Sequence, residues 1–145
     1  MLLAVPLSAA DPFYIGKWKI VSAEVAPWWE DKAHKPDAAG VRAYVGKTVT
    51  FASRSITGPA LLGCTRTQYK LDDRPADSLF QGEFGEMQIR DKSVDPAKIA
   101  ASLGFKGTSW KTLETGCVAE IDYHFLDAST AAFGLDNYVY MLKKQ

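Results

Sequence analysis

The C-terminal third of the chain carries the pattern that most restricts the fold. Three runs rich in β-branched and aromatic residues follow one another over residues 110–113, 118–126 and 131–142. Turn residues at 115–116 and 127–129 separate these runs, as expected for consecutive strands with short links. The sequence therefore predicts an antiparallel meander, and closing a meander into a barrel removes its exposed edges.

Within the second run, apolar and polar side chains alternate residue by residue. This period places alternate residues on opposite faces of a strand. The apolar face comprises Ile121, Tyr123 and Phe125. The polar face comprises Glu120, Asp122 and His124. We interpret the polar face as the solvent-exposed side of the strand, because antiparallel sheets commonly have one face in water. A metal-binding or acid–base role for these three polar residues is the weaker alternative.

Most of the remaining chain has the same strand character. Further strands are predicted over residues 13–25, 45–51, 61–71 and 79–89. One helix is predicted over about residues 95–104, because Asp95 suits the N-cap, Pro96 the first helical position and Gly104 the C-terminal left-handed position. The predicted fold is mainly β: an antiparallel up-and-down β-barrel of about eight strands with one short helix.

Composition and charge exclude several classes of partner. The chain has 145 residues, with 17 Lys and Arg against 17 Asp and Glu, so its formal net charge is zero. The absence of a basic excess argues against a nucleic-acid-binding protein. No segment approaches the ~18 apolar residues of a membrane span. The length fits one domain, which we assign to residues 11–145.

The first ten residues are interpreted as the remnant of a signal peptide. Residues 2–7 are largely apolar, and Ser8-Ala9-Ala10 suits a signal-peptidase site. The segment is shorter than a complete leader and has no basic region. This interpretation predicts a periplasmic or secreted protein.

The two cysteines, Cys64 and Cys117, lie too far apart in sequence for a CxxC redox or zinc motif. In an oxidising compartment they are expected to form a disulfide. Two independent buried thiols in a cytosolic protein are the alternative.

A short motif opens the first predicted strand. Gly16-Lys17-Trp18 begins an apolar run directly after the leader-like segment, and this placement resembles the first strand of lipocalin-like (calycin-type) barrels. The resemblance implies structural roles for Gly16 and Trp18, with the tryptophan closing the base of the barrel. The chain departs from typical lipocalins because its helix precedes the final strands and the later family motifs are absent.

The segment from Trp28 to Arg42 is the long connection between the first two predicted strands. In lipocalin-like barrels the corresponding loop covers the open end, so the resemblance places Trp28 and Trp29 at the mouth. Tyr138 and Tyr140 share a face of the last strand and add polar hydroxyls to the wall. These four aromatic residues are the candidate ligand-binding residues, with core packing as the alternative for each.

The resulting functional expectation is a binding protein. We expect a barrel that takes a small apolar or amphipathic ligand, with no cofactor and no enzymatic activity. The alternative is a protein-binding module of the cell envelope, such as an inhibitor of a protease or lysozyme. A barrel enzyme that uses Asp122 and His124 is the minor third reading, since no Gly-x-Ser-x-Gly nucleophile motif is present.

Overall fold

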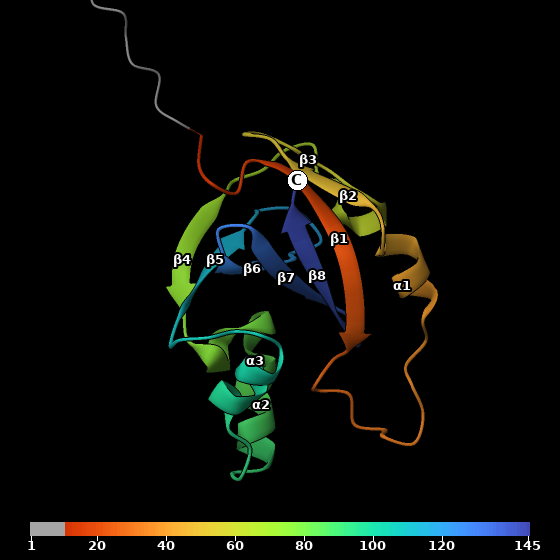
Figure 1. Cartoon of the computed structure of the whole chain (residues 1–145), viewed down its shortest axis with the longest axis vertical. Helices are drawn as coiled ribbons and strands as arrows, with labels where there is room; N and C mark the ends of the chain where they lie inside the picture. Colours follow the sequence, from red (N-terminus) through yellow and green to blue (C-terminus); the bar gives the residue numbers. More distant parts are fainter. Residues whose placement is uncertain (1–10) are drawn as a thin grey trace, which may run out of the picture.

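The computed structural model describes residues 11–145 and contains one strongly curled antiparallel sheet of eight strands (Figure 1). The strands are β1 (Gly16–Val25), β2 (Thr48–Phe51), β3 (Ile56–Thr57), β4 (Lys70–Arg74), β5 (Trp110–Glu114), β6 (Tyr123–Asp127), β7 (Thr130–Leu135) and β8 (Tyr138–Lys144). Their order in the sheet is β3-β2-β1-β8-β7-β6-β5-β4. The predicted mainly β, antiparallel fold is therefore confirmed. Residues 1–10, which carry the signal-peptide interpretation, lie outside the described residues.

Three short α-helices accompany the sheet. They are α1 (Ala39–Tyr44), α2 (Glu83–Arg90) and α3 (Pro96–Ser102). Single 3₁₀ turns also occur: η1 (Ala60–Leu62), η2 (Ala76–Ser78) and η3 (Phe80–Gly82). The predicted helix is α3, and the Asp95 side chain caps it by accepting a hydrogen bond from the backbone N–H of Ala97 at 3.0 Å.

Several predicted strand boundaries are wrong. Residues 80–89 belong to η3 and α2, and both Phe80 and Phe84 are buried in an apolar core with α3 rather than in the sheet. Residues 61–71 contain only the start of β4, after a loop held by a disulfide. Residues 131–142 form two strands, since Asp136 adopts a left-handed φ of 54° and turns the chain between β7 and β8.

The two edges of the sheet, β3 and β4, do not pair with each other, so the curled sheet is a half-barrel. The segment between these strands links the two edges instead. Within it, Cys64 pairs with Ile56 of β3. The Gln68 N–H donates to the Thr115 carbonyl beyond β5 at 2.8 Å. The predicted disulfide between Cys64 and Cys117 is formed, with the Cα atoms 6.0 Å apart.

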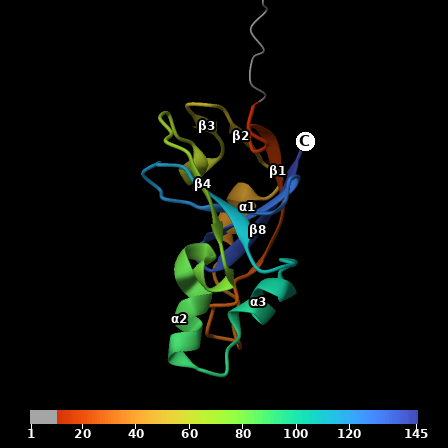
Figure 2. The ribbon, with the colours of Figure 1, turned by 90° about the vertical axis from the view of Figure 1, so that its left-hand side faces the viewer.

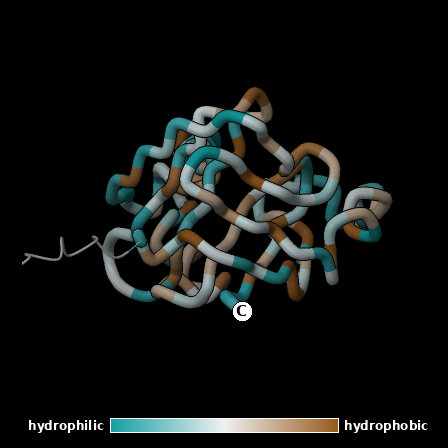
Figure 3. Tube along the Cα trace, turned by 90° about the horizontal axis from the view of Figure 1, so that it is seen from above, coloured by the Kyte–Doolittle hydropathy of each residue, from teal (hydrophilic) through white to brown (hydrophobic). Residues whose placement is uncertain are grey.

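The concave interior of the sheet is filled by the protein's own aromatic side chains. Phe133 stacks on Tyr140 with ring centroids 4.9 Å apart, and Phe51 meets Tyr123 edge to face at 4.8 Å. Trp18 is fully buried among them, and its Nε1 donates to the Tyr14 carbonyl at 3.0 Å. In the view from above, apolar and polar segments alternate along the tube (Figure 3). Because aromatic side chains fill the interior, the hollows described below lie outside it.

The outer face of the sheet is also covered over its central strands. Helices α2 and α3 lie together at one end of the molecule (Figures 1 and 2). A second apolar core forms there. The sheet contributes Trp110, Ala132 and Val139 to it, and these residues alternate along their strands with residues that face the interior. Strands β6, β7 and β8 are therefore buried on both faces, which explains their nearly continuous apolar runs.

Gly16 has a specific conformational reason to be glycine. Its φ is +131°, a region that other residues rarely adopt. It thereby starts β1 in the register that sends Trp18 into the interior. In this structure Gly16 starts β1 and Trp18 packs in the interior.

Candidate functional site

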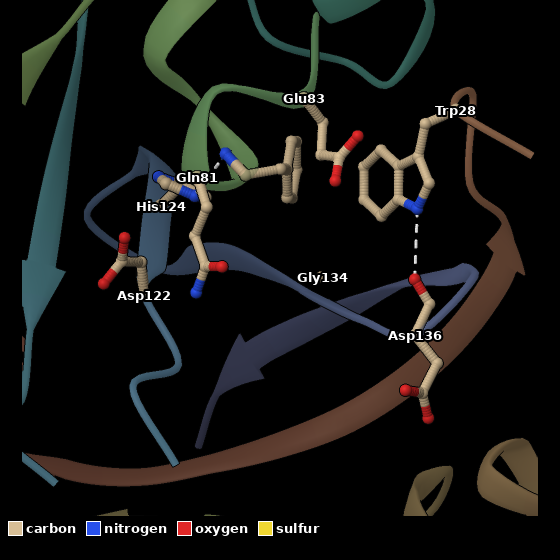
Figure 4. A pocket seen from close by; sticks show the side chains of 8 residues that line it. Trp28, Gln81, Glu83, Asp122, His124, Gly134 and Asp136 are labelled. Carbon is tan, nitrogen blue, oxygen red and sulfur yellow. Dashed lines mark hydrogen bonds between the residues drawn. The ribbon is translucent and has the colours of Figure 1, made fainter. Parts of the chain in front are cut away.

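Two adjoining hollows on the outer side of the sheet form the candidate site, which we call the outer cleft. The first has a volume of about 200 Å³ and is lined by Trp28, Phe80, Gln81, Glu83, Asp122, His124, Gly134 and Asp136. The second, of about 390 Å³, is lined by Gln81, Glu114, Thr115, Gly116, Cys117, Glu120 and Asp122. Gln81 and Asp122 line both, so the two hollows share a wall. Figure 4 shows the first hollow, with Trp28 at one end and Asp122 at the other.

The backbone around the outer cleft is conformationally strained. Phe80 and Gln81 have left-handed φ values of 50° and 58°, and Gly82 continues the turn at 83°. Glu120 and Asp136, also in the lining, have φ values of 51° and 54°. Left-handed non-glycine residues cost free energy and cluster at functional sites, where the surrounding structure holds them in place. The concentration of strain at this cleft supports its choice as the candidate site.

The aromatic wall of the cleft depends on a glycine. Trp28 and Phe80 pack with ring centroids 5.7 Å apart, above Gly134 of β7. A Cβ at position 134 would lie 2.9 Å from Trp28 Cη2 and 3.1 Å from Phe80 Cδ1. The indole Nε1 of Trp28 donates to the Asp136 carbonyl at 3.0 Å, which fixes the ring across the β7–β8 turn. Gly134 therefore allows both rings to approach the sheet.

We expect the Gly134→Ala variant to lose about 1–3 kcal/mol of unfolding free energy, because overpacking forces neighbouring side chains to shift. Urea denaturation followed by tryptophan fluorescence measures this loss and the displacement of Trp28. The control is Gly63→Ala, where the nearest atom to an added Cβ lies at 3.5 Å and no clash arises. Equal stability of the two variants would show that the Trp28–Phe80 wall does not rest on position 134.

His124 supports the cleft from beneath and is neutral. Its Nε2 accepts the backbone N–H of Phe80 at 2.9 Å, and its Nδ1 lies 2.8 Å from Thr112 Oγ1. Burial, together with the charge of Arg74, lowers the pKa of His124 to about 3. Acceptance by Nε2 places the imidazole proton on Nδ1, which donates to the threonine hydroxyl. His124 thus holds the strained start of η3 against β6.

This arrangement corrects the sequence interpretation of a solvent-exposed polar face. His124 has no exposed surface, because η3 and α2 cover that side of β6. Asp122 is partly buried, and Glu120 lies exposed in the loop before the strand. Among residues 11–145, no group of three His, Cys, Asp or Glu side chains is arranged to hold a metal ion. Both ring nitrogens of His124 are already hydrogen-bonded within the protein.

The carboxylates of Glu114, Glu120 and Asp122 line the second hollow, and Arg74, which lies outside the lining, pairs with Glu114 and Asp122. Arg74 of β4 reaches Asp122 with an Nη1–Oδ2 distance of 3.2 Å and Asp72 with an Nε–Oδ1 distance of 3.2 Å. Its Nη2 also pairs with Glu114. Burial raises the pKa of Asp122, and the guanidinium of Arg74 partly offsets this effect. One positive charge facing three carboxylates leaves this side of the cleft negatively charged.

The carboxylate of Glu83 adds negative charge to the end of the first hollow that Trp28 and Phe80 line. Glu83 begins α2, and its carboxylate lies beside the indole of Trp28 (Figure 4). The Asp136 carboxylate points away from Trp28 in the same view. Within the described part of the chain, Glu83 has no ion-pair partner. The first hollow therefore combines aromatic faces with an unpaired carboxylate.

Of the four aromatic residues predicted to bind a ligand, the structure places Trp28 in the outer cleft. Trp29 is next to it in sequence, but its Nε1 donates to the His34 carbonyl at 2.8 Å. Tyr138 and Tyr140 line another hollow, of about 260 Å³. The Tyr138 hydroxyl donates to the Pro36 carbonyl at 2.9 Å, which ties the long connection after β1 to β8.

Sequence reasoning missed Phe80, Gln81, Glu83 and Gly134. The first three fall in the segment interpreted as a strand, and Gly134 lies inside a run read as continuous. The Gln81-Gly82 pair before an amphipathic stretch was the one local signal of a helix start. No local signal indicates that Gly134 faces Trp28.

None of the described helices has the length and apolar character needed to cross a membrane. Comparisons of the chain with protein-family models, with curated proteins and with solved structures find no match. The geometry of the outer cleft therefore carries the functional argument by itself.

Proposed function

We propose that this chain is a binding protein whose outer cleft takes a small amphipathic ligand bearing a cationic amine. The observation that carries the proposal is the lining of the first hollow, where aromatic rings and carboxylates occur together with neutral His124 and no cationic side chain. Ammonium groups are attracted both to the faces of tryptophan rings and to carboxylates. The ammonium group would lie between Trp28 and Glu83.

The volumes of the two hollows indicate which part of the ligand each hollow would hold. The first hollow, at about 200 Å³, is smaller than most sites for complete drug-sized molecules. It suits a substituted ammonium headgroup. The remainder of the ligand would extend past Gln81 and Asp122 into the second hollow.

The curled antiparallel sheet and the disulfide also support a proposal about the class of protein and its cellular compartment. We propose that the chain is a lipocalin-like (calycin-type) protein of the periplasm or extracellular space, since disulfides persist in oxidising compartments. The filled interior argues that its ligand binds outside the sheet, at the outer cleft.

Calorimetric titration with choline and with its neutral carbon isostere, 3,3-dimethylbutan-1-ol, tests the proposed chemistry. We expect choline to bind and the alcohol to bind at least about tenfold more weakly, a difference of about 1.4 kcal/mol. Glu83→Gln should remove most of the choline preference. The matched control is Glu86→Gln, on the same helix but outside the cleft lining. Absence of choline binding, or equal binding of both probes, would overturn the proposal.

A protein-binding module remains the second candidate function because the cleft is open. A lysine or arginine side chain of a basic partner has the same cationic and aliphatic character as the proposed ligand. Binding of a lysine-rich peptide by the wild-type protein, without binding of choline, would favour this second function.

A further inference from the structure

Another surface hollow, which we call the disulfide groove, lies between the loops after β3 and after β5. Its volume is about 810 Å³, within the range of small-molecule sites. Its lining is apolar apart from two threonines and one arginine, and its central residues are Ile56, Leu61, Cys64, Arg66, Cys117 and Val118. The two loops project on the same side of the molecule (Figure 2).

The disulfide joins the two loops that carry the exposed apolar side chains of this groove. Cys64 and Cys117 join the two loops, which contribute Leu61 and Val118 respectively. Leu61 is 58% exposed and Val118 is fully exposed, the largest such values among the apolar side chains apart from Ile89 on α2. Exposed apolar side chains gathered around a hollow are typical of binding surfaces.

Charge distinguishes the disulfide groove from the outer cleft. Arg66 is the one ionisable side chain in its lining, because the two cysteines are disulfide-bonded. Within residues 11–145, Arg66 has no ion-pair partner. A guanidinium without a carboxylate partner favours a carboxylate, sulfate or phosphate group of a ligand.

We propose that the disulfide groove binds a free amphipathic anion with an alkyl chain. The anionic group would pair with Arg66, and the chain would cover Leu61 and Val118. Two large exposed apolar side chains provide limited area for insertion into a bilayer, so the proposal commits to the dissolved molecule rather than to a membrane surface. The disulfide groove shares Gly116 and Cys117 with the second hollow of the outer cleft, but its charge preference is the opposite.

The test is a titration of the full chain with decanoate below its micelle concentration. Methyl resonances of Leu61 and Val118 report binding at the groove itself. We expect saturable shifts of these resonances, and Arg66→Gln should weaken decanoate binding by about tenfold or more. The matched control is Arg54→Gln, which removes an exposed arginine from the nearby β2–β3 turn, outside the lining.

Two further probes separate the proposal from its competitors. Decyltrimethylammonium has the same chain with the opposite charge and should bind at least tenfold more weakly than decanoate. Val118→Ser should weaken decanoate binding while leaving the thermal unfolding temperature unchanged, since this side chain is fully exposed. The proposal is overturned if Arg66→Gln leaves the affinity unchanged or if both surfactants bind alike. It is equally overturned if the protein sediments with anionic phospholipid vesicles but does not bind free decanoate.

Discussion

Removing the Cys64–Cys117 disulfide is expected to lower the free energy of unfolding by about 4 kcal/mol. The bond closes a loop with a sequence separation of 53 residues, and such a cross-link restricts the unfolded chain strongly. It also holds the segment between β3 and β4, the two unpaired edges of the half-barrel, beside the loop after β5. Its loss should therefore affect both states of the folding equilibrium.

The measurement is urea denaturation of the oxidised protein and of the Cys64→Ser/Cys117→Ser variant. The reduced wild-type protein is the control, since it lacks the cross-link without any change of residue, and it should match the variant. A difference below about 1 kcal/mol between oxidised and variant proteins would contradict the expected role of the bond.

Acidification is expected to destabilise the protein through His124. The unfolded histidine titrates with a pKa near 6.5, whereas burial lowers the pKa of His124 to about 3 in the folded state. Between these values the unfolded state binds a proton that the folded state excludes. Stability is therefore fully present above pH 6.5 and is lost as pH falls toward 3, with a loss of about 3 kcal/mol by pH 4.

Urea denaturation at several pH values between 7 and 4 measures this loss. His124→Gln should reduce the dependence on pH, because an amide oxygen can still accept the Phe80 N–H and carries no titrating proton. His34→Gln, at the other and exposed histidine of the chain, should retain the wild-type dependence. If the His34→Gln variant lost the pH dependence and the His124→Gln variant kept it, the assignment of this dependence to His124 would be falsified.

Part of the outer cleft could be predicted from the sequence. Trp28 is recognisable because an aromatic pair opens a long connection between strands. Asp122 and His124 are recognisable from the polar and apolar alternation over residues 120–125. The alternation shows that two faces exist, but it does not show what lies against each face. Leu79 to Ile89 supplies the covering η3 and α2, and a mixed apolar and charged segment of this length is compatible with either a strand or a helix. For this reason the sequence pattern predicts a solvent-exposed His124, whereas the side chain is buried.

Local sequence patterns are enough to predict three features of this protein: the strand periods of the C-terminal third, the capped helix after Asp95 and a pair of cysteines able to form a disulfide. These depend on neighbouring residues, and the physical causes act over a few positions. The filled interior, the burial of neutral His124 and the contact between Gly134 and Trp28 follow instead from three-dimensional packing. Those features depend on contacts between segments far apart in the chain, such as Phe80 with His124, which no local pattern encodes.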